Sequence, residues 1–180
     1  MAEHRFIISG FGGQGVMSMG MILAYAGMLE GKEVTWLPSY GPEMRGGTAN
    51  CHVIISDTPI SSPIVSKATT VVAMNLPSLS KFQDSLENGG ALFINASLID
   101  KKPDRTNIKD YYISANDVAI QLQNSKIANM VMLGAIIKET GVVSVETVEK
   151  VLEKMFHGDK SKLIPVNKEA LKKGGTILLN

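Results

Sequence analysis

The sequence predicts an α/β fold, a three-layer α/β/α sandwich with a mostly parallel sheet that forms a single domain over residues 1–180. Two observations favour this class. Short apolar runs alternate with longer helical segments, as in parallel sheets covered by helices. In addition, 44% of the 180 residues are hydrophobic, which is enough for the core of one domain. The chain has no repeat, low-complexity tract or linker that would divide it.

The chain opens with a strand, a helix and a second strand. Residues 5–9 are expected to form a short buried strand, because their apolar residues are continuous and Gly10 ends the run. Residues 16–29 are expected to be helical and residues 33–37 to form the second strand. These three segments make a βαβ unit of about the usual 30 residues, so we expect the two strands to pair in parallel.

The same alternation continues along the rest of the chain. Further strands are expected over residues 49–56, 70–74, 91–95 and 111–113. Helices are expected over residues 77–86, 116–124, 129–140 and 144–156, and near 166–173. Pro77 suits a first helical turn, Gly89 and Gly90 should break the chain before the strand at 91–95, and Ser144 resembles a helix cap.

Composition excludes several function classes. Eighteen basic and seventeen acidic residues leave a net charge of +1, so no strong field favours nucleic acid or a membrane as partner. A single cysteine excludes an internal disulfide framework, a four-cysteine zinc site and an iron–sulfur cluster ligated by this chain alone, and the three histidines show no metal-ligand spacing. The chain begins without a secretory pattern, and its longest apolar stretch falls short of the roughly 20 residues that cross a bilayer. We therefore expect a cytoplasmic protein.

A glycine-rich loop over residues 10–15 follows the first strand and gives the chain a Rossmann-like start. It satisfies G-x-G-x-x-G, and the N–H groups that open the next helix could hold a phosphate or carboxylate. NAD or FAD would also require an acidic residue at the end of the second strand, where this chain has Leu37, Pro38 and Ser39. Two alternatives stay open: the loop meets another anion or nucleotide-like group, or its glycines only permit tight packing. The Gln14 amide suits either alternative.

A second loop, over residues 38–48, follows the second strand. Because loops at the carboxyl ends of adjacent parallel strands share a crevice, we expect it to face the glycine loop. Arg45 is the candidate clamp for an anion, and Gly46 and Gly47 would let a ligand approach the backbone closely. The simpler interpretation is that Glu43 and Arg45 are solvated charges.

Two helical segments lack the polar face that a helix covering a sheet normally shows to water. Residues 16–29 contain no charged side chain, and residues 127–137 repeat this pattern with Asn129 as the main polar group. We expect a partner chain to cover both segments, and hence an obligate assembly. The alternative is that both are central helices covered by the chain's own fold.

Three motifs together resemble the gamma subunit of 2-oxoacid:ferredoxin oxidoreductases over essentially the whole chain. They are Gly12-Gly13-Gln14-Gly15, Pro38-Ser-Tyr-Gly-Pro-Glu-Met-Arg-Gly-Gly47 and Asn129-Met-Val-Met-Leu-Gly134. The sequence around Tyr40 is most similar to that of the 2-oxoglutarate branch of this family.

The resemblance implies one subunit of an enzyme complex. The complex decarboxylates an oxoacid on thiamine diphosphate, passes electrons through iron–sulfur clusters to ferredoxin and releases an acyl-CoA, here succinyl-CoA. It implies alpha, beta and delta subunits as partners, which hold the thiamine diphosphate, magnesium and clusters, while this chain alone holds no cofactor and carries no catalytic residue. A homodimer is a possible form in isolation.

The resemblance also implies a buttressing role, with CoA meeting the two loops. The candidate cofactor-binding residues are Gly12, Gly13, Gln14, Gly15, Ser39, Tyr40, Glu43, Arg45, Gly46 and Gly47. The alternative function is a stand-alone α/β module that binds a nucleotide or CoA.

Four other polar residues have simpler interpretations. Cys51 is expected to be a buried, inert thiol, and the adjacent His52 should point to the opposite face of the strand, which excludes a Cys–His dyad. Asn75 and Asn95 end predicted strands, where satisfying turn backbone is commoner than binding a ligand. Asn129 is expected to cap a helix or fix a loop.

Overall fold

The computed structural model describes residues 2–39 and 48–177. Its strands are β1 (Glu3–Gly10), β2 (Glu33–Ser39), β3 (Ala49–Ser56), β4 (Ala68–Ala73), β5 (Leu86–Asn95) and β6 (Lys109–Ile113). Its α-helices are α1 (Val16–Leu29), α2 (Leu76–Phe82), α3 (Ala115–Gln121), α4 (Ala128–Thr140), α5 (Val145–Met155) and α6 (Ile164–Ile177). Short 3₁₀ helices cover Gln83–Ser85, Ser125–Ile127 and Gly158–Leu163.

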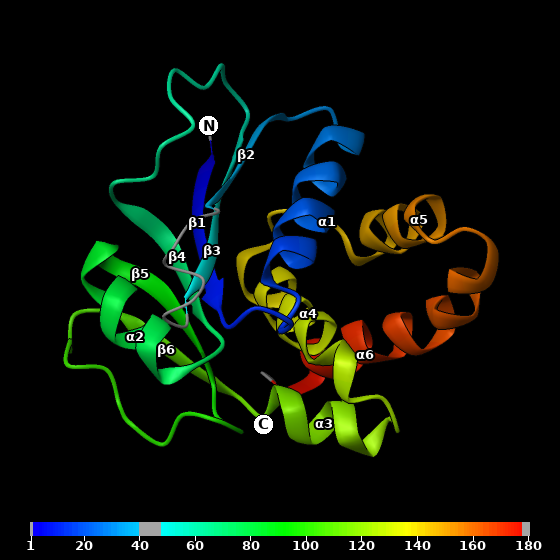
Figure 1. Cartoon of the computed structure of the whole chain (residues 1–180). Helices are drawn as coiled ribbons and strands as arrows, with labels where there is room; N and C mark the ends of the chain where they lie inside the picture. The colour runs from blue at the N-terminus through cyan, green and yellow to red at the C-terminus, as the bar shows by residue number, and fades with distance from the viewer. Residues whose placement is uncertain (1, 40–47, 178–180) are drawn as a thin grey trace.

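The strands form one sheet in the order β2-β3-β1-β4-β5-β6. The pairs β1–β4, β4–β5 and β5–β6 are parallel, whereas β3 runs antiparallel to both of its neighbours. Helices cover both faces, so the predicted α/β fold with a mostly parallel sheet is confirmed (Figure 1).

The predicted parallel pairing of the first two strands is wrong, because β3 lies between β1 and β2. β3 pairs with β1 over eight residues, from Ser56 opposite Glu3 to Ala49 opposite Gly10. Its side chains are almost all buried, whereas those of β2 are half-buried or exposed. The more apolar strand therefore occupies the interior of the sheet, and β2 takes the edge, where Pro38 is tolerated.

The two helical layers differ greatly in thickness. Helices α1, α3, α4, α5 and α6 lie on one side of the sheet, and α2 lies on the other (Figure 1). The larger core lies between the sheet and α1 and α4, and the smaller core is closed by α2 together with Ile60 and Val65 from the loop before β4.

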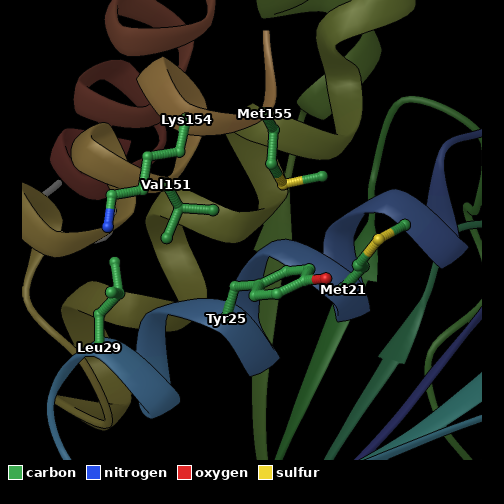
Figure 2. A pocket seen from close by; sticks show the side chains of 6 residues that line it. All are labelled: Met21, Tyr25, Leu29, Val151, Lys154 and Met155. Carbon is green, nitrogen blue, oxygen red and sulfur yellow. The ribbon is translucent and has the colours of Figure 1, made fainter.

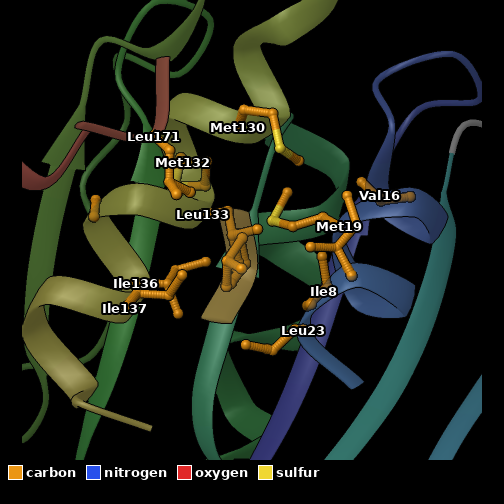
Figure 3. Packing of buried hydrophobic residues seen from close by; sticks show 14 of the residues in the cluster. Ile8, Val16, Met19, Leu23, Met130, Met132, Leu133, Ile136, Ile137 and Leu171 are labelled. Carbon is orange, nitrogen blue, oxygen red and sulfur yellow. The ribbon is translucent and has the colours of Figure 1, made fainter. Parts of the chain in front are cut away.

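Helix α4 is covered by its own fold. Every residue from Ala128 to Ile137 is buried, and the helix packs against α1, α3, α6 and β5 (Figure 3). At its crossing with α6 the two backbones touch through Gly134 and Gly174, each of which leaves no room for a Cβ atom. The expectation that a partner covers this segment is therefore wrong, because close backbone approach brings α6 over it.

Helix α1 is covered on one side only. Its inner side approaches the sheet through Gly20 and Gly27, where an added Cβ would overlap side chains of β2 and β3. Its outer side leaves Tyr25, Met28 and Leu29 exposed, at 47%, 59% and 45%. A partner that covers this side stays a prediction.

Several element boundaries differ from those predicted, among them those of α2 and β5. Helix α2 ends at Phe82 and continues as a 3₁₀ turn, and β5 starts at Leu86 and runs through the two glycines that were expected to precede it. A register shift between β4 and β5 accommodates them, with Gly89 at φ 77°. The predicted cap at Ser144 is confirmed, because its side chain accepts from the Thr147 N–H at 3.1 Å.

Candidate functional site

The glycine loop joins β1 to α1 at the carboxyl edge of the sheet. Gly13 and Gly15 have φ angles of 93° and 72°, which favour glycine. An added Cβ on Gly15 would lie 2.5 Å from Nδ2 of Asn129, and one on Gly10 would lie 2.7 Å from Oε1 of Gln14. Tight packing therefore accounts for Gly10 and Gly15, and the positive φ angle accounts for Gly13.

Gln14 uses its side-chain amide within the fold. Its Oε1 accepts from the Phe11 N–H at 2.6 Å, and its Nε2 donates to the Met74 carbonyl at 3.1 Å. The Nδ2 of Asn75 also lies 3.5 Å from the same Oε1. Since the chain leaves β1 toward one face and β4 toward the other, a ligand crevice would be expected between these two strand ends. Gln14 ties the two ends together, with Oε1 and one donor of its amide used within the fold.

Three asparagines hold the loops of this edge in place. Asn129 Nδ2 donates to the Gly15 carbonyl at 3.2 Å, which confirms its expected loop-fixing role. Asn75 caps α2, because its Oδ1 accepts from the Ser78 N–H at 2.8 Å. Asn95 is fully buried and donates from Nδ2 to the Met74 carbonyl at 3.2 Å. The structure thus favours turn satisfaction over ligand binding for Asn75, whereas in Asn95 the Nδ2 is satisfied and the buried Oδ1 has no hydrogen-bond partner among the described residues.

The tip of the glycine loop is open to whatever approaches this edge. Phe11, Gly12 and Gly13 are exposed, and an added Cβ on Gly12 would meet no atom within 4 Å in the described part of the chain. The N-cap residue of α1 is Gly15, which has no side chain to cap the first turn, so the first N–H groups of the helix stay oriented toward the loop. The beginning of the helix remains suited to an anion.

A cavity of about 550 Å³ opens beside this helix start. Its walls include Ser18 from α1, Lys126 from the turn before α4, Asn129 from the first turn of α4, Phe156 directly after α5 and Asn167 from α6. It combines polar amide groups with an apolar interior and one lysine.

The two predicted loops do not follow adjacent strands. Gly10 lies opposite Ala49 and Ser39 lies opposite Asn50, so β3 separates the ends of β1 and β2. The premise that β1 and β2 are neighbours is therefore wrong, whereas the expectation that the two loops face each other stays a prediction. The other predicted residues of this loop lie outside the described residues: Tyr40, Glu43, Arg45, Gly46 and Gly47.

Cys51 and His52 behave as predicted. The Cys51 side chain is fully buried under α1, and burial raises the pKa of its thiol to about 12. His52 lies on the opposite face of β3, where its Nδ1 accepts from the Val65 N–H at 3.2 Å and burial lowers its pKa. The two side chains form no dyad. Within residues 2–39 and 48–177, no group of three or more His, Cys, Asp or Glu side chains could hold a metal ion.

The exposed side of α1 is flanked by two apolar grooves that residue patterns had not located. The groove between α1 and α5 has a volume of about 450 Å³ (Figure 2). It is lined by Met21, Tyr25, Leu29, Val151, Lys154 and Met155. The groove between α1 and β2 has a volume of about 260 Å³ and is lined by Met21, Ala24, Tyr25, Met28, Val34 and Trp36. The signal in the sequence is the helical spacing of 21, 25, 28 and 29.

Residues 5–177 match the family described as pyruvate ferredoxin/flavodoxin oxidoreductase. The chain belongs to this family. It is similar to the 2-oxoglutarate synthase subunit KorC of Methanocaldococcus jannaschii, at 37% identity over 160 residues, which cover 86% of this chain and 85% of KorC. It is also similar to the ketoisovalerate oxidoreductase subunit VorA of Methanothermobacter marburgensis, at 36% identity over 174 residues. That match covers 96% of this chain but 36% of VorA, so the chain spans about a third of the length of VorA.

Solved structures agree with this assignment. The gamma subunit of a keto/oxoacid ferredoxin oxidoreductase from Geobacter sulfurreducens has a TM-score of 0.85 and 30% identity, with 98% of both chains covered. The predicted likeness to gamma subunits of this family is therefore confirmed, as is the prediction that the chain is a subunit of an oxidoreductase. In the described residues no helix is both long and apolar enough to span a bilayer.

Proposed function

We propose that this chain is the gamma subunit of a thiamine-diphosphate-dependent 2-oxoacid:ferredoxin oxidoreductase, with 2-oxoglutarate as the oxoacid. The complex would convert 2-oxoglutarate and CoA to succinyl-CoA and CO₂ and pass the electrons to ferredoxin. The observation that carries this proposal is the match in length and fold to separate subunits of such enzymes. The matches cover 85% of the KorC chain and 98% of the Geobacter gamma chain.

In this role the chain contributes surfaces and no catalytic group. Its one thiol is buried, with a pKa of about 12, and is therefore not a nucleophile at neutral pH. The alpha and beta subunits would hold the thiamine diphosphate and magnesium, and the beta and delta subunits the iron–sulfur clusters. This chain would buttress the catalytic subunits.

The glycine loop supports a second part of the proposal, that this chain lines the approach of CoA. The uncapped first turn of α1 and the open space around Gly12 suit a diphosphate that approaches the backbone. Arg45 would supply the positive charge, with Ser39, Tyr40, Glu43, Gly46 and Gly47 beside it. Gln14 takes a positioning role here, because its amide is used to hold the loop.

Co-expression with the alpha, beta and delta chains from the source organism tests the main proposal. We expect oxoacid- and CoA-dependent ferredoxin reduction only when this chain is included, with a higher kcat/KM for 2-oxoglutarate than for pyruvate or ketoisovalerate. Full activity without this chain would overturn its role as a required subunit. A higher kcat/KM for another oxoacid would overturn the substrate assignment.

The CoA contribution is tested in the same complex. We expect Arg45→Ala to raise the KM for CoA about tenfold while the KM for the oxoacid is unchanged, since the lost contact is an ion pair with phosphate. Lys160→Ala, at an exposed lysine in the turn before α6, is the matched control. An unchanged KM for CoA in the Arg45 variant would remove this part of the proposal. An isolated chain that stays monomeric and binds CoA or a nucleotide tightly would favour the stand-alone module instead.

A further inference from the structure

The outer side of α1 carries an apolar ridge formed by Met21, Tyr25, Met28 and Leu29. Three of these four side chains are exposed, at 47% for Tyr25, 59% for Met28 and 45% for Leu29. Their spacing places them on one face of the helix over about two turns. Helix α1 has no charged residue to interrupt this face.

The ridge is held rigidly from behind. Gly20 and Gly27 bring the helix so close to the sheet that an added Cβ on Gly27 would lie 2.9 Å from Val34. Met19 and Leu23, on the buried side, pack into the larger core (Figure 3). The exposed side chains are therefore presented by a fixed helix, which lowers the entropic cost of binding a partner.

Two grooves run beside the ridge, and their chemistry defines what fits them. Figure 2 shows Tyr25 and Leu29 from α1 facing Val151 and Met155 from α5, with Lys154 at the rim. Lys154 is the one charged residue that lines either groove among the described residues, and it pairs with no acidic side chain there. The grooves thus fit an apolar segment that carries an acidic group near Lys154.

The relatives indicate where such a segment comes from. The counterpart of this chain occupies 36% of VorA, where it is covalently continuous with a much longer remainder of the polypeptide. In KorC the counterpart is 85% of the whole subunit. Where the remainder is a separate polypeptide, only non-covalent contact can hold the two together.

We propose that the α1 ridge and its two grooves dock an apolar helix of the polypeptide that corresponds to the rest of VorA. An acidic side chain of that helix would meet Lys154. This inference rests on the proposed function, because it places one partner chain of the complex on one surface of this protein. Both Met21 and Tyr25 line the two grooves, and Tyr25 is the central anchor because it is the aromatic and the more exposed of the two.

The test measures binding of this chain to the separately purified partner subunits by biolayer interferometry. We expect Tyr25→Glu and Met28→Glu to raise the Kd about 30-fold or more, as for anchors at the centre of an interface. The matched control is Ile120→Glu on α3, which replaces an apolar side chain that is 63% exposed and should change the Kd less than about twofold. Circular dichroism of each variant checks that the fold is retained.

A charge reversal tests the rim of the groove. Lys154→Glu should raise the Kd about fivefold at low salt and less at high salt, whereas Lys160→Glu should not change it. Equal binding by the ridge variants and the Ile120 control would overturn the docking inference while the proposed function stands. No binding by the wild-type chain would overturn the proposed function itself. A ridge variant that only converts an isolated dimer to a monomer, with partner binding unchanged, would assign the ridge to self-association and overturn the inference.

Discussion

The crossing of α4 and α6 gives the sharpest prediction of stability. An added Cβ on Gly174 of α6 would lie 2.7 Å from the carbonyl carbon of Val131, and the carbonyl oxygen would be closer still. Likewise, an added Cβ on Gly134 of α4 would lie 2.8 Å from the carbonyl carbon of Leu171. Because the obstructing atoms belong to backbone, no side-chain rotation relieves the overlap. We therefore expect Gly174→Ala to force the two helices apart.

The magnitude follows from two opposing contributions. Overpacking a well-packed core costs about 1–3 kcal/mol and sometimes more, and backbone overlap against the buried α4 belongs at the upper end, at about 3–4 kcal/mol. Replacing glycine by alanine within a helix contributes about 1 kcal/mol in the other direction. The free energy of unfolding should thus fall by about 2–3 kcal/mol, which lowers the Tm by roughly 5–10 °C in a protein of this size.

Gly175 provides the matched control on the same helix. An added Cβ there would lie 3.7 Å from its nearest neighbours, which is ordinary van der Waals contact. Gly175→Ala should therefore raise the unfolding free energy by about 0.5–1 kcal/mol. Urea unfolding followed by far-ultraviolet circular dichroism measures both variants. Equal stability of the two variants, or greater stability of the Gly174 variant, would refute the reasoning.

Three further predictions concern single polar groups. Burial lowers the pKa of His52 below its ordinary 6.5, so on acidification the unfolded state takes up a proton before the folded state does. The free energy of unfolding should therefore fall as the pH drops below about 6.5. Urea titrations from pH 7.5 to 5 should show a shallower fall for His52→Asn than for the wild type, and an equal fall would contradict this. Cys51, with a pKa of about 12, should resist Ellman's reagent at pH 8 until guanidinium unfolds the chain, whereas rapid labelling of the native protein would contradict its burial. Asn75→Ala should lower the unfolding free energy by about 1 kcal/mol through loss of the α2 cap, and Asn75→Asp should retain most of it, which urea titration at pH 7 measures.

Local signals in the sequence predict local structure well in this protein. The first strand, the glycine loop and α1 follow from a continuous apolar run, a glycine cluster and a helical stretch that adjoin each other in sequence. The insertion of β3 between β1 and β2 depends instead on which strand gains most from an interior position. Pairing of β3 with both neighbours, for example Val53 opposite Phe6 and Trp36, is a property of the assembled sheet. Adjacency in the sequence cannot predict it.

The candidate site shows the same division. Composition and spacing predict that the loop over residues 10–15 adjoins a helix start, but they leave open what Gln14 binds. The answer depends on Met74, sixty residues away in the sequence, whose carbonyl accepts from Gln14 Nε2. Similarly, α1 and α4 both lack a polar face in sequence. Hydrophobicity indicates that a helix is covered, whereas the covering element is decided by distant residues such as Gly174.

Helix α1 connects the two surfaces for which we propose contacts with CoA and with a partner chain. The uncapped first turn and the exposed tip at Gly12 lie at its beginning, and the ridge centred on Tyr25 lies in its second half. The helix has 14 residues, or about 21 Å at 1.5 Å per residue, and glycine contacts fix it against the sheet. A partner docked on the ridge therefore also fixes the position of the glycine loop relative to itself, because both are carried on one rigid element. Mutation of Tyr25 and Gly12 should accordingly affect different steps. Tyr25→Glu should raise the Kd for the partner chain, and Gly12→Val should raise only the KM for CoA.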